Sequence, residues 1–143
     1  MFVFLVACAD EPTPIVHDAC SPLALVGDDD SIAAAEALWN AVGVTAIGAA
    51  GGDALPVIFT SRAAPDEFGA YAGSAIYVNE DVVGEQRTIV LAHEIGHAIG
   101  LVHVSDRPSV MNPGNLTLAP SIDDDAAVIA AWGSCGDATT HDR

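Results

Sequence analysis

Residues 93–103 read HEIGHAIGLVH, and the spacing of the three histidines in this stretch decides the fold that we expect. On a helix, His93 and His97 lie one turn apart on the same face, so their imidazoles converge on one ion. Gly100 is expected to end the helix with a left-handed backbone, which turns the chain back and brings His103 to the same point. Three neutral imidazole nitrogens are typical zinc ligands, and they leave a fourth coordination position open.

Glu94 is the candidate general base of this site. It is rotated by about 100° from His93 around the helix, so its carboxylate lies beside the metal and not among the ligands. A carboxylate in that position takes a proton from a water that the metal activates. Two other interpretations stay open. In the first, the three histidines pack within the protein or face solvent and bind no metal. In the second, the site binds zinc but does not catalyse a reaction.

The rest of the sequence predicts further helices and a small sheet. The acidic residues 28–30 and Ser31 precede an apolar stripe that predicts a helix over 32–42, ending near Gly43. A second helix over 85–99 carries the histidines. The strands are expected from short β-prone runs: residues 44–50, 55–61 and 74–79, with residues 69–73 at an edge and 62–68 as a loop.

A third helix is expected after residue 121. Ser121 and Asp124 have the spacing of a capping box, with Asp in place of Glu, and an apolar run follows them. This helix is expected to end at Trp132, because Gly133 comes next.

Composition bounds the size of the fold and the class of partner. The chain has 143 residues, about half of them apolar, which predicts one domain with a single core. Its formal net charge is −16, with four arginines and no lysine, so nucleic acid and anionic lipid headgroups would be repelled. No apolar run reaches the 18 residues that a membrane-spanning helix needs. We expect a soluble monomer whose acidic residues are mostly solvated.

The N-terminal residues suggest export. Residues 1–8 read MFVFLVAC, similar to the lipobox of a bacterial lipoprotein signal peptide that is shortened here, in which Cys8 would carry the lipid. The alternative is a buried N-terminal strand. Residues 9–27 are expected to form a tether with one short strand late in it. The domain is expected over 28–135, with a tail over 136–143.

Two further cysteines flank the predicted domain. With Cys8 set aside, Cys20 precedes the domain and Cys135 follows its last helix. They either form a disulfide, which would persist only in an oxidising compartment, or remain two unpaired buried thiols. A disulfide agrees with an extracytoplasmic location. Neither cysteine has the spacing of a metal site.

The pattern HExxHxxGxxH resembles the signature of the metzincin zinc proteases, which continue to a Met-turn. Ser109–Val110–Met111–Asn112–Pro113 is similar to that turn, with Met111 as the hydrophobic floor beneath the ligands. Within the metzincins the chain looks most like a matrixin, because residues 73–81 (GSAIYVNED) are similar to the matrixin strand before the active-site helix. The resemblance covers about residues 28–133.

The resemblance implies a fold, an activity and a substrate. The fold would be an α/β domain of the α+β zincin type: a small, mostly parallel, twisted sheet with two helices above a zinc cleft, and a short C-terminal part with the Met-turn and one helix. The activity would be that of a zinc-dependent endopeptidase. A protein or peptide substrate would pair with an edge strand over 69–73, and residues 112–120 would wall its pocket.

Some features depart from the family, and two rival functions stay open. Pro113 stands where astacins and serralysins have tyrosine, and no cysteine-switch propeptide is expected. A second, structural zinc is not expected, because only His17 and His141 remain. Calcium has ligands available in three acidic residues, although such residues are usually just solvated: Asp53, Glu80 and Asp81. The rivals are an inactive zinc-binding module that binds peptides or a partner, and an exopeptidase or zincin with another third ligand.

Overall fold

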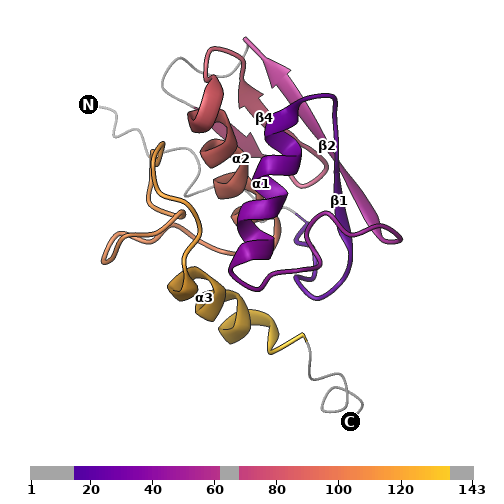
Figure 1. Cartoon of the computed structure of the whole chain (residues 1–143), viewed down its shortest axis with the longest axis vertical. Helices are drawn as coiled ribbons and strands as arrows, with labels where there is room; N and C mark the ends of the chain where they lie inside the picture. Colours follow the sequence, from indigo (N-terminus) through magenta and orange to yellow (C-terminus); the bar gives the residue numbers. More distant parts are fainter. Residues whose placement is uncertain (1–14, 62–67, 136–143) are drawn as a thin grey trace, which may run out of the picture.

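The computed structural model describes residues 15–61 and 68–135, which form a four-stranded sheet and three helices. Figure 1 shows two of these helices against the sheet and the third near the C-terminal end. The elements in chain order are β1 (Leu23–Val26), α1 (Asp30–Ala41), β2 (Asp53–Thr60), β3 (Gly69–Tyr71), β4 (Ile76–Asn79), α2 (Gly84–Ala98) and α3 (Ile122–Trp132). The predicted α/β zincin-like fold class is confirmed. Cys8, His141 and the tail over 136–143 lie outside the described residues.

The sheet has the strand order β1-β2-β4-β3 and is mostly parallel, as predicted. β1 pairs parallel with β2 and β2 pairs parallel with β4, whereas β3 runs antiparallel to β4 at the edge. The short strand expected late in residues 9–27 is β1, and its Leu23 is fully buried. The sheet therefore includes residues that precede the first helix.

Helices α1 and α2 lie side by side on the same side of the sheet (Figure 1). Asp29 caps α1, because its carboxylate accepts a hydrogen bond from the backbone nitrogen of Ser31 at 3.0 Å. The fully buried Trp39 joins the two helices, since its Nε1 donates to the carbonyl oxygen of Ala92 at 2.9 Å. This contact fixes α2, which carries the histidine pair, against the core.

The strand predicted over residues 44–50 is wrong. This segment is irregular and shares one isolated bridge with the sheet, between Leu23 and Ile47. The amide of Asn40 donates to the carbonyl oxygens of Val44 and Ile47, at 3.0 and 2.9 Å. These two oxygens would otherwise accept hydrogen bonds from a neighbouring strand. A strand prediction from apolar β-branched residues does not register this competition.

The other predicted elements are present with shifted ends. β2 begins at Asp53, two residues earlier than expected. β4 begins at Ile76 and not at residue 74, because Ala72 and Ala75 form a turn in which the nitrogen of Ala72 donates to the carbonyl oxygen of Ala75 at 2.9 Å. The predicted capping box of α3 is confirmed.

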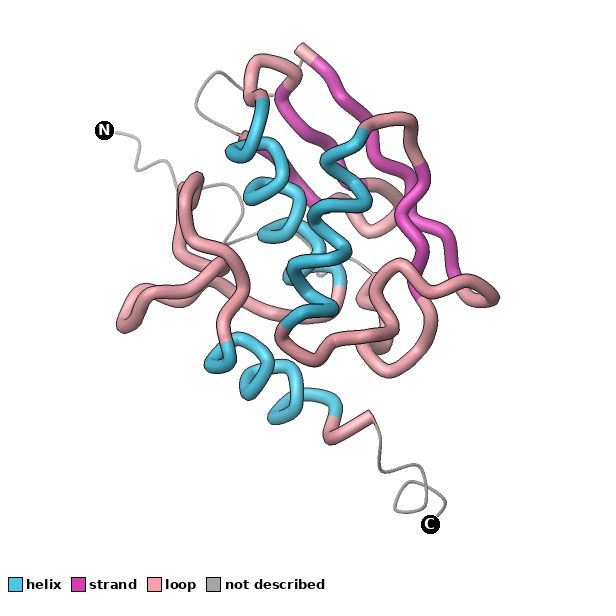
Figure 2. Tube along the Cα trace, viewed as in Figure 1, coloured by secondary structure: helices cyan, strands magenta, loops and turns pink. Residues whose placement is uncertain are grey.

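The core lies between the sheet and helices α1 and α2 and extends to the long loop before α3 (Figure 2). Its fully buried large side chains are Trp39, Leu23, Ile47, Leu55, Ile76, Leu91, Ile95, Ile99, Met111, Val78 and Val110. Among the described helices, none combines the length and the apolar character needed to cross a membrane.

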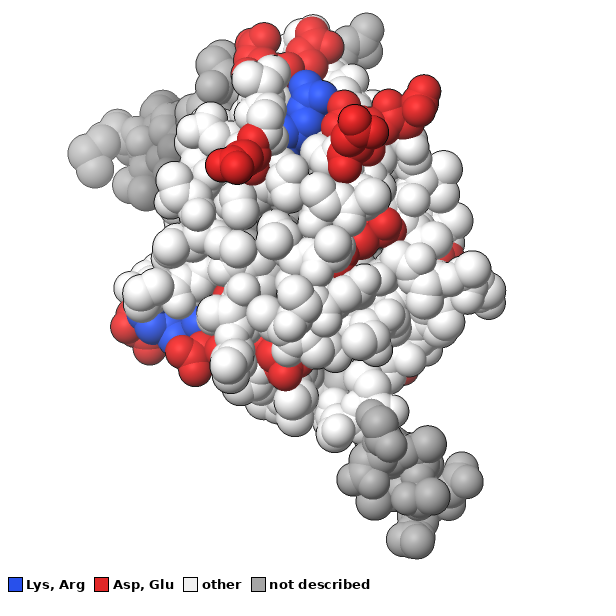
Figure 3. All heavy atoms as spheres, in the orientation of Figure 1, with Lys and Arg blue, Asp and Glu red and all other residues white. Residues whose placement is uncertain are grey.

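Charged side chains gather in two places on the face drawn in Figure 3, where acidic groups surround basic ones, and most of the remaining face is uncharged. Each described arginine has an acidic partner. Arg87 Nη1 lies 2.7 Å from the carboxylate of Asp29, and Arg107 Nη1 lies 3.1 Å from that of Asp124. Both arginines are therefore engaged within the fold.

Candidate metal centre

Helix α2 places two histidines one turn apart on its inner side. The helix forms because a long apolar face, from Ile89 to Ala98, packs against the sheet and α1. His93 is buried, with 8% of its surface exposed, and His97 is half-buried. Packing therefore holds both imidazoles in position before any ligand binds.

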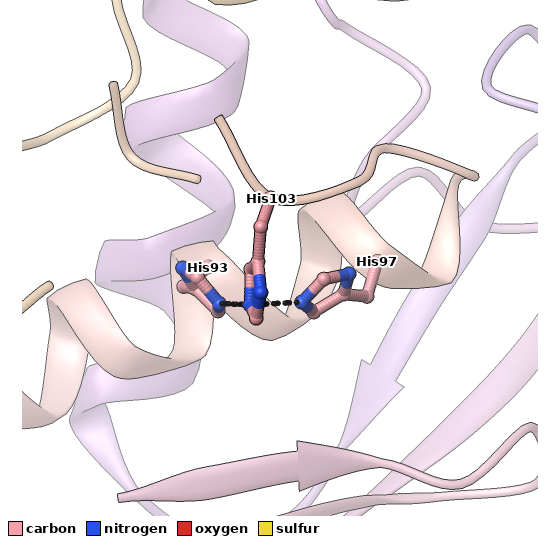
Figure 4. Close-up of side chains that lie close together, drawn as sticks. All are labelled: His93, His97 and His103. Carbon is pink, nitrogen blue, oxygen red and sulfur yellow. Dashed lines mark hydrogen bonds between the residues drawn. The ribbon is translucent and has the colours of Figure 1, made fainter. Parts of the chain in front are cut away.

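The chain reverses at Gly100 and returns a third histidine to the first two. Gly100 has a φ of +93°, a left-handed conformation that favours glycine. Its nitrogen donates to the carbonyl oxygen of His97 at 3.0 Å, and the nitrogen of Leu101 donates to that of Gly96 at 2.9 Å. The turn brings His103 over the helix, between the other two imidazoles (Figure 4).

The three Nε2 atoms converge on one point. Nε2 of His103 lies 3.3 Å from Nε2 of His93 and 3.2 Å from Nε2 of His97. All three ligand atoms lie within 4.8 Å of one another. Nitrogens that bind zinc at about 2.0–2.1 Å with tetrahedral angles are about 3.3–3.4 Å apart. The two pairs that include His103 therefore have the spacing of a tetrahedral zinc site, and three ligands leave one position open.

Backbone carbonyls fix the tautomer of two of these imidazoles. Nδ1 of His93 lies 2.6 Å from the carbonyl oxygen of Val110, and Nδ1 of His97 lies 2.8 Å from that of Leu101. A carbonyl oxygen only accepts, so each Nδ1 carries the proton and each Nε2 presents its lone pair to the centre. Two Nε2 lone pairs aimed at one point are the arrangement of a metal site, in which a cation accepts both.

Burial keeps the three imidazoles neutral. Burial, aided by the neighbouring His97 and His103, lowers the pKa of His93 from its ordinary value of 6.5 to about 4, although the hydrogen bond to Val110 acts to raise that pKa. Burial also lowers the pKa of His97 and of His103. Neutral imidazole is the form that binds a metal, so this environment fits a divalent cation.

Glu94 follows His93 on α2 and lies between the helix and the edge strand β3. Only 4% of its surface is exposed. A Cβ built on Gly69 of β3 would lie 3.3 Å from Cγ of Glu94 and 2.8 Å from Cγ1 of Val90, so the strand approaches the helix closely at a residue with no side chain. The carboxyl-bearing side chain thus faces the strand along which we expect the substrate to lie.

Met111 lies against Gly96 of α2 and is almost fully buried, with 1% of its surface exposed. A Cβ on Gly96 would overlap Sδ of Met111 and would lie 3.4 Å from Cζ2 of Trp39. The glycine between the two helical histidines therefore makes room for the thioether. Sequence reasoning singled out Met111 and Gly100, but not this role of Gly96.

Asp124 holds the segment that contains Met111, a role that sequence reasoning missed. Its carboxylate is fully buried and accepts hydrogen bonds from Oγ of Ser109 at 2.6 Å and from the nitrogen of Val110 at 3.2 Å. Burial alone would raise its pKa, but hydrogen bonds from Ser109, Val110, Ser121 and Arg107 lower the pKa below its usual range. In the sequence, only the capping box pointed to Asp124. It predicted the start of a helix but not the contacts of Asp124 with Ser109 and Val110.

The acidic residues named as calcium ligands lie apart. Asp53 begins β2, whereas Glu80 and Asp81 follow the end of β4, and the two strands are parallel. Asp53 therefore lies at the opposite end of the sheet from the other two. Its carboxylate lies 3.2 Å from Nδ1 of His17.

Cys20 and Cys135 form a disulfide that spans 115 positions of the sequence. It joins the segment before β1 to the residues just after α3, as the positions of the cysteines suggested. The open alternative of two unpaired thiols does not hold for this structure.

The fold and the site define a zincin-like metallopeptidase, and comparison with known families agrees. The Matrixin peptidase family model matches residues 59–131, just over half of the chain, so this chain belongs to the matrixin family. The matched residues include β3, β4, α2, the three histidines and most of α3. No curated protein matches the chain.

Proposed function

We propose that this chain is a zinc-dependent endopeptidase, with the metal held by His93, His97 and His103. The observation that carries the proposal is the convergence of three Nε2 atoms at 3.2 and 3.3 Å, with the Nδ1 atoms of both helical histidines held by backbone carbonyls. When bound, zinc supplies a Lewis acid that lowers the pKa of water and polarises a carbonyl. Membership of the matrixin family supports the same activity.

Glu94 is the residue that moves the proton. Its carboxylate would take a proton from the attacking water and later deliver it to the nitrogen of the departing amine. The position of Glu94 supports this role, because it is buried beside His93 and its side chain lies against Gly69 of β3. The three histidines stay neutral and transfer no proton.

The edge strand β3 would align the substrate. β3 is the last strand in the sheet order, and within the described residues it pairs with β4 alone. An extended peptide that pairs with the outer edge of Gly69–Tyr71 would pass the side chain of Glu94. Backbone hydrogen bonds would then set the register of the scissile bond over the metal.

A pocket that includes Val104, the residue after His103, would accept one substrate side chain. Its volume is about 550 Å³, and it is lined by Val104, Ser105, Asp106, Arg107, Pro108, Asn112, Pro113 and Leu118. Part of its wall, Asn112, Pro113 and Leu118, belongs to the segment 112–120 that we expect to wall the substrate pocket. Leu118→Trp would narrow this pocket and shift the cleavage profile of a peptide library. An unchanged profile would mean that the segment is only a surface loop.

We also infer that the protein acts outside the cytoplasm. The disulfide Cys20–Cys135 supports this, because such bonds persist in oxidising compartments. Lipidation of Cys8 is a separate proposal that rests on the sequence of residues 1–8. Mass spectrometry of the mature N-terminus tests it, and a mature chain that retains residues 1–7 would contradict it.

Proteolysis is tested with the zinc-loaded protein on denatured casein, with Glu94→Gln as the test variant and Glu85→Gln as the control. Glu85 is exposed and lies in the first turn of the same helix. Glu94→Gln should bind zinc and lose activity, while Glu85→Gln should match the parent protein. If the parent protein is as inert as Glu94→Gln, the chain is an inactive zinc-binding module.

Two further measurements separate the remaining alternatives. Cleavage of a peptide blocked at both ends distinguishes an endopeptidase from an exopeptidase. His103→Ala should lower zinc affinity strongly. A variant that still binds zinc like the parent would show that another residue is the third ligand.

A further inference from the structure

Two donors from distant parts of the chain occupy the last carbonyl oxygens of α2. The nitrogen of His17 donates to the carbonyl oxygen of Ala98 at 2.8 Å, and Nε1 of Trp132 donates to that of Ile99 at 2.6 Å. The final carbonyls of a helix have no partner within the helix, so these two bonds complete its end. From this C-terminal end of α2, the chain turns back toward His103.

The same two segments pack on the turn itself. A Cβ built on Gly100 would lie 3.2 Å from Cγ1 of Val16 and 3.7 Å from Cζ2 of Trp132. Gly100 itself is exposed, but the segment before β1 and the last residue of α3 both lie close to it. A shift of the turn toward either neighbour would bring it into contact with Val16 or Trp132.

Backbone hydrogen bonds further restrict the segment between Ile99 and His103. The nitrogen of Leu101 is bound to the carbonyl oxygen of Gly96, and the nitrogen of Val104 is bound to that of Met111 at 3.0 Å. His103 thus lies on a short segment that is held on one side at Ile99 and on the other at Val104. A change at the Ile99 end would move the His103 imidazole relative to the helical pair.

The disulfide links the two segments that reach the end of α2. Cys20 lies three residues after His17, and Cys135 lies three residues after Trp132. The bond between the cysteines keeps the end of α3 beside the segment before β1. Neither cysteine is one of the metal-ligating residues, so the disulfide would act on the site only through this packing.

We propose that Trp132 is a positioning residue for His103, and that the disulfide Cys20–Cys135 keeps Trp132 in place. This inference rests on the proposed zinc site and adds a residue to it. Trp132 acts through the carbonyl oxygen of Ile99, which holds the start of the turn. Trp132 is not one of the proposed ligands, and under this proposal its influence on zinc affinity requires His103 to be present.

A double-mutant cycle on zinc affinity tests this dependence. Zinc affinity is measured by competition with a chromophoric chelator for the full chain, Trp132→Phe, His103→Ala and the double variant. Trp132→Phe keeps an aromatic ring and removes only the donor. Loss of a group that hydrogen-bonds a metal ligand directly typically weakens metal affinity by about 10–100-fold. Trp132 acts one step further out, through Ile99, so we expect a loss of at most about 10-fold. In the His103→Ala background the same change should have no further effect.

Controls separate positioning from a general loss of structure. Ile129→Ala, at a half-exposed residue one turn earlier on α3, should bind zinc like the parent protein. With Co²⁺ in place of zinc, Trp132→Phe should also alter the visible absorption bands, which report the ligand geometry. If Trp132→Phe does not fold, Cys20→Ser/Cys135→Ser takes its place in the cycle, with the same expected dependence on His103.

The outcomes distinguish this inference from the proposed function. Equal losses of affinity with and without His103, or no loss in either background, would overturn the positioning role while leaving the zinc site intact. Failure of the parent protein to bind zinc would overturn the proposed function itself, and the positioning role with it.

Discussion

Nδ1 of His93 lies 2.6 Å from the carbonyl oxygen of Val110, and this contact joins the helix that carries the metal ligands to the segment that carries Met111. The nitrogen of the same residue, Val110, donates to the buried carboxylate of Asp124. One peptide segment therefore connects the start of α3 to the imidazole. The orientation of His93 depends on a side chain outside the HExxHxxGxxH motif.

The first prediction concerns Asp124. Asp124→Asn should lower the free energy of unfolding by about 2–3 kcal/mol, because hydrogen bonds to a buried charged group are lost or weakened. It should also weaken zinc binding through Val110 and His93. Chemical denaturation and zinc competition measure the two effects. Asp123→Asn is the matched control, since Asp123 is an exposed neighbour on the same turn. Equal effects of the two changes would contradict this account.

The second prediction is a pH dependence of the metal-free protein. The folded pKa of His93 is about 4 and its ordinary value is 6.5, so between these values the unfolded chain binds more protons than the folded chain. The free energy of unfolding should therefore be highest above about pH 6.5 and should decrease as the pH falls toward about 4. Urea denaturation at a series of pH values measures it. His93→Gln should flatten this dependence, and an unchanged slope in that variant would argue against it.

The third prediction concerns the glycine between the helical histidines. Gly96→Ala should destabilise the protein by about 1–3 kcal/mol through overpacking against Met111, more than the gain of about 1 kcal/mol in helix propensity. Thermal unfolding measures the change. Combining it with Met111→Ala should cost less than the sum of the two single changes, because the smaller side chain removes the overlap. Strict additivity would show that Met111 does not occupy that space.

The fourth prediction concerns the disulfide. Reduction of Cys20–Cys135 by a dithiol, or Cys20→Ser/Cys135→Ser, should destabilise the protein by up to about 4.7 kcal/mol, the chain-entropy value for a loop of about 100 residues. Thermal unfolding before and after reduction, with the free thiols counted, checks this. An unchanged melting temperature after reduction has released two further thiols per chain would contradict a stabilising role.

Local pattern predicted much of the fold and the histidine site. The spacing of His93 and His97 is a property of one helix, and the turn at Gly100 is a property of one residue, so both could be inferred from the sequence. The capping box at Ser121 likewise depends on residues that are close together in the sequence, as does the position of each helix along the chain. These features depend on neighbours a few residues apart.

The features that the sequence did not predict depend on the partners that particular side chains find in the fold. Asn40 takes the carbonyl oxygens that a strand over 44–50 would have used. The contacts of Trp132 with Ile99, and of Asp124 with Val110, join residues 33 and 14 positions apart. A single sequence shows what such side chains can donate or accept, but not which partner the fold will bring to them.

The binding of one zinc ion by three imidazoles is the central claim, and metal analysis of the purified protein tests it most directly. Zinc is added to metal-free protein, the excess is removed, and bound zinc is measured by elemental analysis together with His93→Ala, His97→Ala and His103→Ala. We expect one zinc per chain in the parent protein and a large loss of affinity in each variant. A parent protein that retains no zinc, or that binds it equally well without these histidines, would contradict the account.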